Sequence, residues 1–63
     1  MKEKFITIKD AAKFLGFSAG YLYKMVKKKE IPYYQPTGNK ILFDKEEIEK
    51  WVKNSKVSEN HEN

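Results

Sequence analysis

The chain has 63 residues, of which 40% are hydrophobic and 35% are charged, and it contains no cysteine. A chain of this length forms one small domain without room for a deep catalytic cleft, and without cysteine it has neither disulfides nor a zinc–thiolate site. No apolar run approaches the roughly 20 residues that span a bilayer. We therefore expect a soluble cytoplasmic protein that is not an enzyme and does not enter a membrane.

The first predicted helix covers residues 8–15. Thr7 and Asp10 form a capping box in which Asp takes the place of the usual Glu. Gly16 stops the helix, because glycine adopts a left-handed conformation without a Cβ clash. The preceding Phe5-Ile6 either pairs as a short strand or packs as a lid on the core. The apolar residues of this helix lie on one face: Ile8, Ala11, Ala12 and Leu15.

The second predicted helix covers residues 19–29 and begins after Ser18, which is a good N-cap. Its inward positions follow the i, i+3, i+4 spacing of an amphipathic helix: Leu22, Met25 and Val26. The opposite face carries three lysines: Lys24, Lys27 and Lys28. A short connection containing Gly16 separates the two helices, which is typical of a helix-turn-helix motif. An ordinary helical hairpin with a solvated lysine face is the alternative.

The segment Gly16-Phe17-Ser18-Ala19-Gly20 also matches the Gly-x-Ser-x-Gly pattern of a hydrolase nucleophile elbow. That elbow requires a strand before it and a histidine base within reach. Here the preceding segment is predicted to be helical, and the single histidine, His61, lies in a polar tail. We therefore interpret Ser18 as a helix cap.

A β-hairpin is predicted after the second helix, because the residue before Pro32 is pushed out of the α region. Its arms cover residues 33–36 and 40–43, which are rich in β-formers and flank a cluster of turn residues. Tyr33 and Tyr34 invite a stacking role on nucleic acid. The alternative is that one ring packs on the core and the other stays half exposed.

The third predicted helix covers residues 45–53 and is capped by Asp44, with Glu47 at the third helical position. Its inward residues are predicted to be Ile48, Trp51 and Val52. Among these we expect Trp51 to be the largest single burial in the core. Residues 1–54 then form the domain, and residues 55–63 are predicted to be a disordered polar tail.

Charge is distributed unevenly along the chain, whose 13 basic residues are all lysines and whose net charge is +4. From Ser18 to Lys40, five lysines meet one acid, a local charge of +4; from Asp44 to Lys53, three lysines meet four acids, a local charge of −1. One side of the domain is therefore expected to be basic. This asymmetry favours a polyanion as partner, because neutralising phosphates releases condensed counterions.

With these parts in order, the chain resembles the excisionase-like helix-turn-helix family, a compact branch of the winged-helix group related to the DNA-binding part of MerR-type regulators. The resemblance covers about residues 6–52. The segments that carry it are Ile6-Thr7-Ile8-Lys9-Asp10-Ala11-Ala12, Leu15-Gly16-Phe17-Ser18, Leu22-Tyr23-Lys24-Met25-Val26, Glu30-Ile31-Pro32-Tyr33-Tyr34, Gly38-Asn39-Lys40, Phe43-Asp44 and Ile48-Glu49-Lys50-Trp51-Val52. It implies a mainly α fold with a small β-hairpin, a winged helix-turn-helix of three helices plus a wing.

The resemblance implies double-stranded DNA as the partner and a role in recombination directionality or in transcriptional control of a mobile element. It also suggests further partners, which are an integrase or recombinase or additional copies of the chain on tandem sites. No cofactor, metal or small-molecule ligand is expected. The residues predicted to bind DNA are Ser18, Ala19, Gly20, Tyr21, Lys24, Lys27, Lys28, Gln35, Thr37, Asn39 and Lys40.

The chain departs from the family pattern where members carry arginines, because Ala19 and Asn39 stand there and no arginine occurs anywhere. Lysine is a mobile point charge suited to phosphates, whereas arginine makes the bidentate contact that reads guanine. Lys29 also replaces the usual glycine before Glu30, so the end of the second helix is not fixed by the sequence. The alternative function is a protein-interaction module that kept the scaffold and lost DNA binding.

Overall fold

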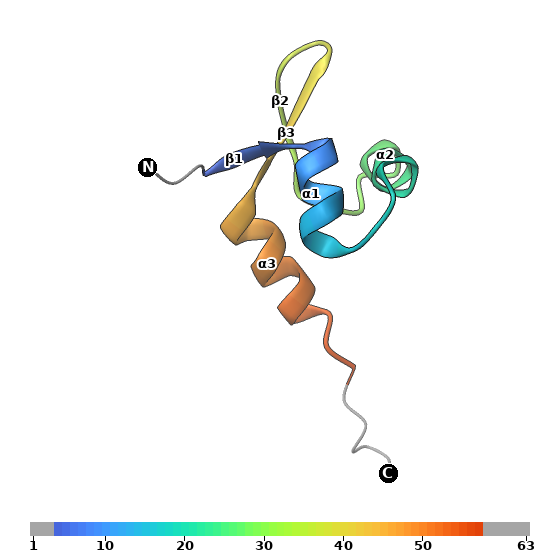
Figure 1. The fold of residues 1–63 in the computed structure, drawn as a ribbon, viewed down its shortest axis with the longest axis vertical. Coiled ribbons are helices and arrows are strands. Elements are labelled where there is room, and N and C mark those ends of the chain that lie inside the picture. The colour runs from blue at the N-terminus through green and yellow to red at the C-terminus, as the bar shows by residue number, and fades with distance from the viewer. Residues whose placement is uncertain (1–3, 58–63) are drawn as a thin grey trace.

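The computed structural model describes residues 4–57, which form three helices and three strands (Figure 1). In chain order the elements are β1 (Phe5–Thr7), α1 (Ile8–Leu15), α2 (Ala19–Lys27), β2 (Tyr34–Thr37), β3 (Lys40–Asp44) and α3 (Lys45–Asn54). The three predicted helices and the hairpin, here β2 and β3, are confirmed. Within residues 4–57, no helix has the length and apolar content needed to cross a bilayer.

The strands form one antiparallel sheet in the order β1-β3-β2. The segment Phe5-Ile6, which the sequence left open as strand or lid, is part of the edge strand β1. Ile6 lies opposite Phe43 in the pairing of β1 with β3, and both side chains are buried. The sheet therefore closes the core on one side and extends outward as the β2–β3 hairpin, which we call the wing (Figure 1).

The caps of α1 are those that the sequence predicts. The Thr7 hydroxyl accepts a hydrogen bond from the Asp10 N–H at 3.3 Å. Gly16 has φ 79°, a left-handed conformation, and the N–H groups of Gly16 and Phe17 both donate to the carbonyl oxygen of Ala12, at 2.8 and 2.9 Å. This satisfies a C-terminal carbonyl and turns the chain sharply toward α2.

The end of α2 differs from the prediction, since the helix stops at Lys27 and not at residue 29. Lys29 adopts the left-handed conformation, with φ 56°. Its N–H donates to the Val26 carbonyl at 3.0 Å, and the N–H of Glu30 donates to the Met25 carbonyl at 2.9 Å. These two bonds are the Schellman pattern that ends many helices, and here a lysine occupies the position that usually holds glycine.

Lys29→Gly is therefore expected to stabilise the domain by about 1 kcal/mol, because a left-handed conformation costs an L-residue roughly 1–2 kcal/mol and costs glycine little. Gly16→Ala should be destabilising by a similar amount, since a Cβ at Gly16 meets no atom within 4 Å and only the backbone cost remains. Chemical denaturation of both variants measures this. A Lys29→Gly variant no more stable than Lys29→Ala would contradict the expectation.

The core lies between the sheet and the helices. Its buried hydrophobic residues are Ile6, Ala11, Ala12, Leu22, Met25, Val26, Ile31, Phe43 and Ile48. The largest fully buried side chains are Phe43, Leu22 and Ile48. The inward face predicted for α2 is therefore confirmed, and β3 supplies the most buried ring.

Two of the predicted inward residues of α3 are placed differently. Trp51 is only partly buried against the core, so the prediction that it is the largest single burial is wrong, and Val52 is 41% exposed. The reason is the direction of α3, whose first turns pack on the sheet through Ile48 while its later turns run beyond the core (Figure 1). The helix ends at Asn54, and residues 58–63 of the predicted tail, including His61, lie outside the described residues.

No linker separates β1 from α1 or β3 from α3. Thr7 is both the last residue of β1 and the N-cap of α1, and Asp44 is both the last residue of β3 and the N-cap of α3. The Asp44 carboxylate accepts hydrogen bonds from the N–H groups of Glu46 and Glu47 at 3.0 and 3.3 Å, as predicted. The wing is thus joined directly to α3 at its base, and its neighbouring strand β1 is joined directly to α1.

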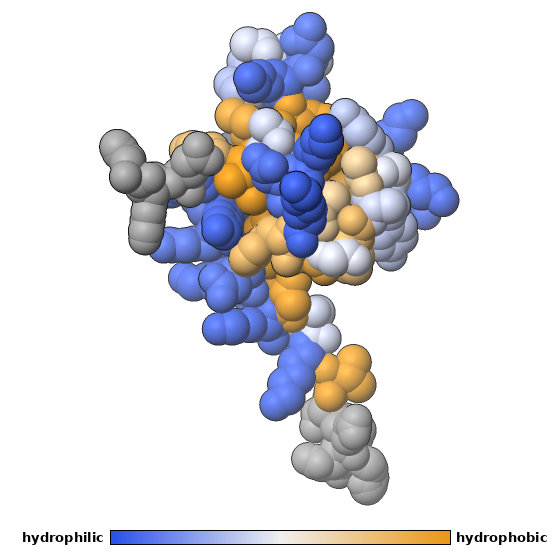
Figure 2. All heavy atoms as spheres, viewed as in Figure 1, coloured by the Kyte–Doolittle hydropathy of each residue, from blue (hydrophilic) through white to orange (hydrophobic). Residues whose placement is uncertain are grey.

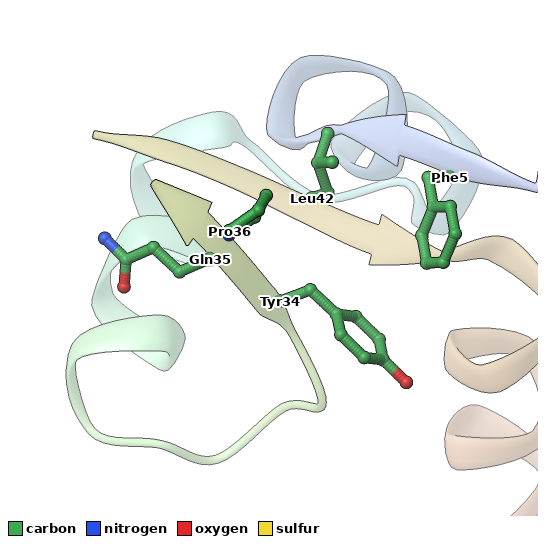
Figure 3. A pocket seen from close by; sticks show the side chains of 5 residues that line it. All are labelled: Phe5, Tyr34, Gln35, Pro36 and Leu42. Carbon is green, nitrogen blue, oxygen red and sulfur yellow. The ribbon is translucent and has the colours of Figure 1, made fainter. Parts of the chain in front are cut away.

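A second tie holds the wing to α3. The Tyr34 hydroxyl lies 3.0 and 2.9 Å from the two carboxylate oxygens of Glu47, to which it donates, and the Tyr34 ring packs edge-on against Phe5 with centroids 5.5 Å apart. Tyr33 packs against the core. The arrangement with one ring on the core and one half exposed is therefore the one observed, and Figure 3 shows Tyr34 directed toward Phe5 and away from Gln35.

The hydrogen bond to Glu47 is the main cause that raises the pKa of Tyr34 above its ordinary value, with burial and the nearby charges of Glu47 and Asp44 adding to it. A raised folded-state pKa means that the stabilisation is complete below the ordinary tyrosine pKa, about 10, and is lost as pH rises through the folded-state value. The free energy of unfolding of the wild type should therefore fall more between pH 9 and pH 12 than that of Tyr34→Phe. Equal pH dependence in paired urea titrations would contradict this.

Candidate nucleic-acid interface

The exposed face of α2 carries the predicted lysines. Leu22, Met25 and Val26 are buried, and this fixes the rotation of the helix about its axis. Gly20, Lys24 and Lys27 are spaced by four and three residues, so they share the opposite face, and all three are exposed. A Cβ at Gly20 would meet no atom within 4 Å. The centre of this face is therefore open to close approach, with lysines beside it.

Within the described residues, no carboxylate lies within ion-pair distance of the lysines on this face. Among residues 4–57, the ion pair is the one between the Lys4 ammonium and the Asp44 carboxylate, whose nitrogen and oxygen are 3.7 Å apart. It lies at the base of the sheet. Most of the acidic residues among 4–57 lie at the start of α3, at Asp44, Glu46, Glu47 and Glu49, while Asp10 lies in α1 and Glu30 follows α2. Figure 2 shows hydrophilic side chains at the wing tip, on the side where α2 lies and along the side where α3 lies.

The start of α2 is built by a cap and an aromatic contact. The Ser18 hydroxyl accepts a hydrogen bond from the Tyr21 N–H at 3.1 Å. Ser18 is therefore the predicted cap, and the segment before it is the helix α1 where a nucleophile elbow requires a strand. Ala19 is partly buried, and the Tyr21 ring packs edge-on against Phe17 with centroids 5.2 Å apart.

The wing tip holds the remaining predicted residues. Thr37 pairs with Lys40 across a turn of two residues, Gly38 and Asn39. The side-chain amide of Gln35 donates to the Gly38 carbonyl at 2.9 Å, so this residue braces the turn. The Thr37 hydroxyl lies 3.5 Å from the side-chain oxygen of Asn39, a long contact. Lys40 is exposed at the first position of β3.

The predicted site residues thus fall into two groups. The first group lies on or beside α2 and consists of Ser18, Ala19, Gly20, Tyr21, Lys24, Lys27 and Lys28. The second group lies at the wing tip and consists of Gln35, Thr37, Asn39 and Lys40. Figure 1 shows the two groups on separate projections of the molecule. They are connected through β1, which pairs with β3 at the base of the wing and leads directly into α1, on which α2 packs.

Sequence reasoning did not include Tyr23 among the site residues. This side chain is 52% exposed, more than any other aromatic residue in the described part of the chain. It lies four residues after Ala19 and four before Lys27, so it shares a flank of α2 with them. That spacing could have identified it. Within residues 4–57, no group of three histidine or acidic side chains is placed to hold a metal ion.

Three helices, a steep turn between the first two and a wing attached to the third define a winged helix-turn-helix domain. Residues 5–56 match the pattern of a helix-turn-helix domain family, and the chain belongs to this family of excisionase-like DNA-binding domains. No curated protein and no solved structure matched the chain. The family establishes DNA binding as the general function.

Proposed function

We propose that the chain binds duplex DNA with α2 in the major groove and the wing on the adjacent minor groove or backbone. The observation that carries this proposal is the lysine face of α2, which lies opposite the buried face and has no carboxylate within ion-pair distance among residues 4–57. Such a face gains from releasing counterions at phosphates. The docking follows the general geometry in which the second helix of a helix-turn-helix enters the groove.

The proposed contacts divide by chemistry. The lysines contact phosphates, which gives affinity with little sequence information. The start of α2 lies nearest the floor of the groove, so Tyr21 and the small residues before it are the proposed base contacts there. At the wing tip, Thr37 and Asn39 approach the neighbouring groove. Without arginine, sequence preference relies on these polar groups and on DNA shape. The proposed phosphate contacts are Lys24, Lys27, Lys28 and Lys40.

The biological role we propose is that of an excisionase-like factor or a small transcriptional regulator of a mobile element. A single module of this kind buries only about 600–1,000 Å² on DNA and binds weakly alone. Useful affinity would then come from tandem copies or from a DNA-bound integrase, because linking two binding events raises the effective concentration of the second. Selection of bound sequences from a random library, followed by measurement of DNA bending on the selected site, tests this role.

The test of DNA binding itself uses fluorescence anisotropy with a random-sequence duplex at low salt. The triple variant Lys24→Gln, Lys27→Gln, Lys28→Gln should lose most binding. The matched control removes three lysines from α3 and the residues after it: Lys50→Gln, Lys53→Gln, Lys56→Gln. It lowers the net charge equally and should retain more affinity. Equal losses in the two triple variants would show that only total charge matters.

The alternative function, a protein-interaction module without DNA binding, has one structural observation in its favour. A groove of about 410 Å³ is lined by Phe5, Tyr34, Gln35, Pro36 and Leu42 (Figure 3), and a second groove of about 270 Å³ includes the exposed rings of Phe14 and Phe17. Exposed apolar surface of this kind suits a protein partner. Wild-type protein that causes no change in anisotropy at low salt would favour this alternative.

A further inference from the structure

The two flanks of α2 face different parts of the domain. Phe17 lines a groove with Glu49 and Val52 of α3, and the Tyr21 ring packs against Phe17. The flank that carries Tyr21 is therefore on the α3 side. In Figure 1 the wing extends to the opposite side of the molecule from α3.

Tyr23 lies two residues after Tyr21, which is about 200° around a helix of 3.6 residues per turn. Because Leu22, Met25 and Val26 fill the inward face, this rotation puts Tyr23 on the opposite exposed flank, toward the wing. Its side chain is 52% exposed. The same flank carries Lys27 one turn later, and the small Ala19 one turn earlier leaves space beside the ring.

We propose that Tyr23 contacts the DNA strand that runs between α2 and the wing, with its hydroxyl donating to a phosphate oxygen. This inference rests on the proposed function and adds a residue to it. A helix in the major groove faces one phosphate backbone on each flank, and a wing in the neighbouring groove lies across one of those backbones. Tyrosine hydroxyls are among the groups that make such contacts. In this arrangement the Tyr23 flank of α2 faces the phosphate backbone that lies between α2 and the wing.

An uncharged contact leaves a distinct thermodynamic signature. Removing a lysine that neutralises a phosphate changes both the affinity and its salt dependence, because fewer counterions are released. Removing the Tyr23 hydroxyl should lower the affinity without changing the salt dependence. This separates a direct contact from an indirect disturbance of the neighbouring lysines.

The experiment measures the affinity of wild type, Tyr23→Phe and Tyr23→Ala for one duplex across a salt series. Tyr23→Phe should weaken binding about fivefold and Tyr23→Ala about tenfold, where tenfold corresponds to ~1.4 kcal/mol, with parallel salt slopes. Phe14→Ala is the matched control, since it removes a ring that is 41% exposed on another face, and it should bind within about twofold of wild type.

A duplex series with single methylphosphonate groups then locates the contact. At one position the neutral group should weaken wild-type binding, and it should have no further effect on Tyr23→Phe. If wild type binds and both Tyr23 variants match it, the Tyr23 contact is wrong while the proposed function stands. A change in the salt slope of Tyr23→Phe would also overturn the direct contact. Failure of the wild type to bind would overturn the proposed function, and this inference with it.

Discussion

Phe43→Ala is expected to unfold the domain. Phe43 is the largest fully buried side chain, at 0% exposure, and it lies opposite Ile6 in the sheet. Truncation of a core phenylalanine costs about 3–5 kcal/mol, and a domain of this size has only a few kcal/mol of net stability. Circular dichroism at 25 °C should show loss of helix, and heating should give no cooperative transition.

Two further variants keep this expectation testable. Phe43→Leu retains most of the volume and should melt cooperatively with a loss of about 1–2 kcal/mol. Trp51→Ala removes a larger side chain that is only partly buried, so it should cost less than Phe43→Ala. If Trp51→Ala proved the more damaging of the two, the order of burial described above would not set the order of stability.

DNA binding should weaken steeply with salt. The four proposed phosphate contacts, at Lys24, Lys27, Lys28 and Lys40, imply a slope of roughly −3 to −4 in log K against log salt. Raising the salt from about 50 to about 200 mM should then lower the affinity on the order of a hundredfold. Lys24→Ala and Lys28→Ala should each flatten the slope by about one unit and weaken binding to all sequences alike.

Lys50→Ala is the matched control for these variants, because it removes one lysine from α3, where the acidic residues gather. It should leave the slope within the error of the wild type. A slope near zero for the wild type, or an equal change in Lys24→Ala and Lys50→Ala, would contradict specific phosphate contacts by α2. The lysine face would then be a solvated surface.

Most of the fold could be predicted because it is encoded locally. Ser18, Asp44 and Gly16 mark helix ends through bonds to residues close by in the chain, and the structure contains each of those bonds. The end of α2 could not be predicted in this way. Lys29 adopts a conformation that lysine disfavours, so the tertiary path toward Pro32 overrides the local preference.

Features that depend on distant parts of the chain were not predictable. Whether Phe5-Ile6 forms a strand depends on its pairing with β3, and the paired residues Ile6 and Phe43 are 37 positions apart in the chain. How deeply Trp51 is buried depends on where α3 leaves the sheet. The bond from Tyr34 to Glu47 joins residues 13 apart in the chain. For the candidate site, the lysine face and the opposite flanks of Tyr21 and Tyr23 followed from helical period alone, whereas the contact with Phe17 was required to tell which flank faces α3.

The absence of linkers at Thr7 and Asp44 has a consequence for the partner. No hinge residue lies between β1 and α1 or between β3 and α3, and the hydroxyl of Tyr34 braces the wing a second time. The base of the wing is therefore held directly on α3, so ordering it on binding should cost little conformational entropy. In the docking proposed above, a mismatch between the position of the wing and the groove spacing of relaxed B-form DNA would then be taken up largely by the duplex. Sites that bend or twist easily would be selected for their elasticity, even at base pairs that no side chain touches.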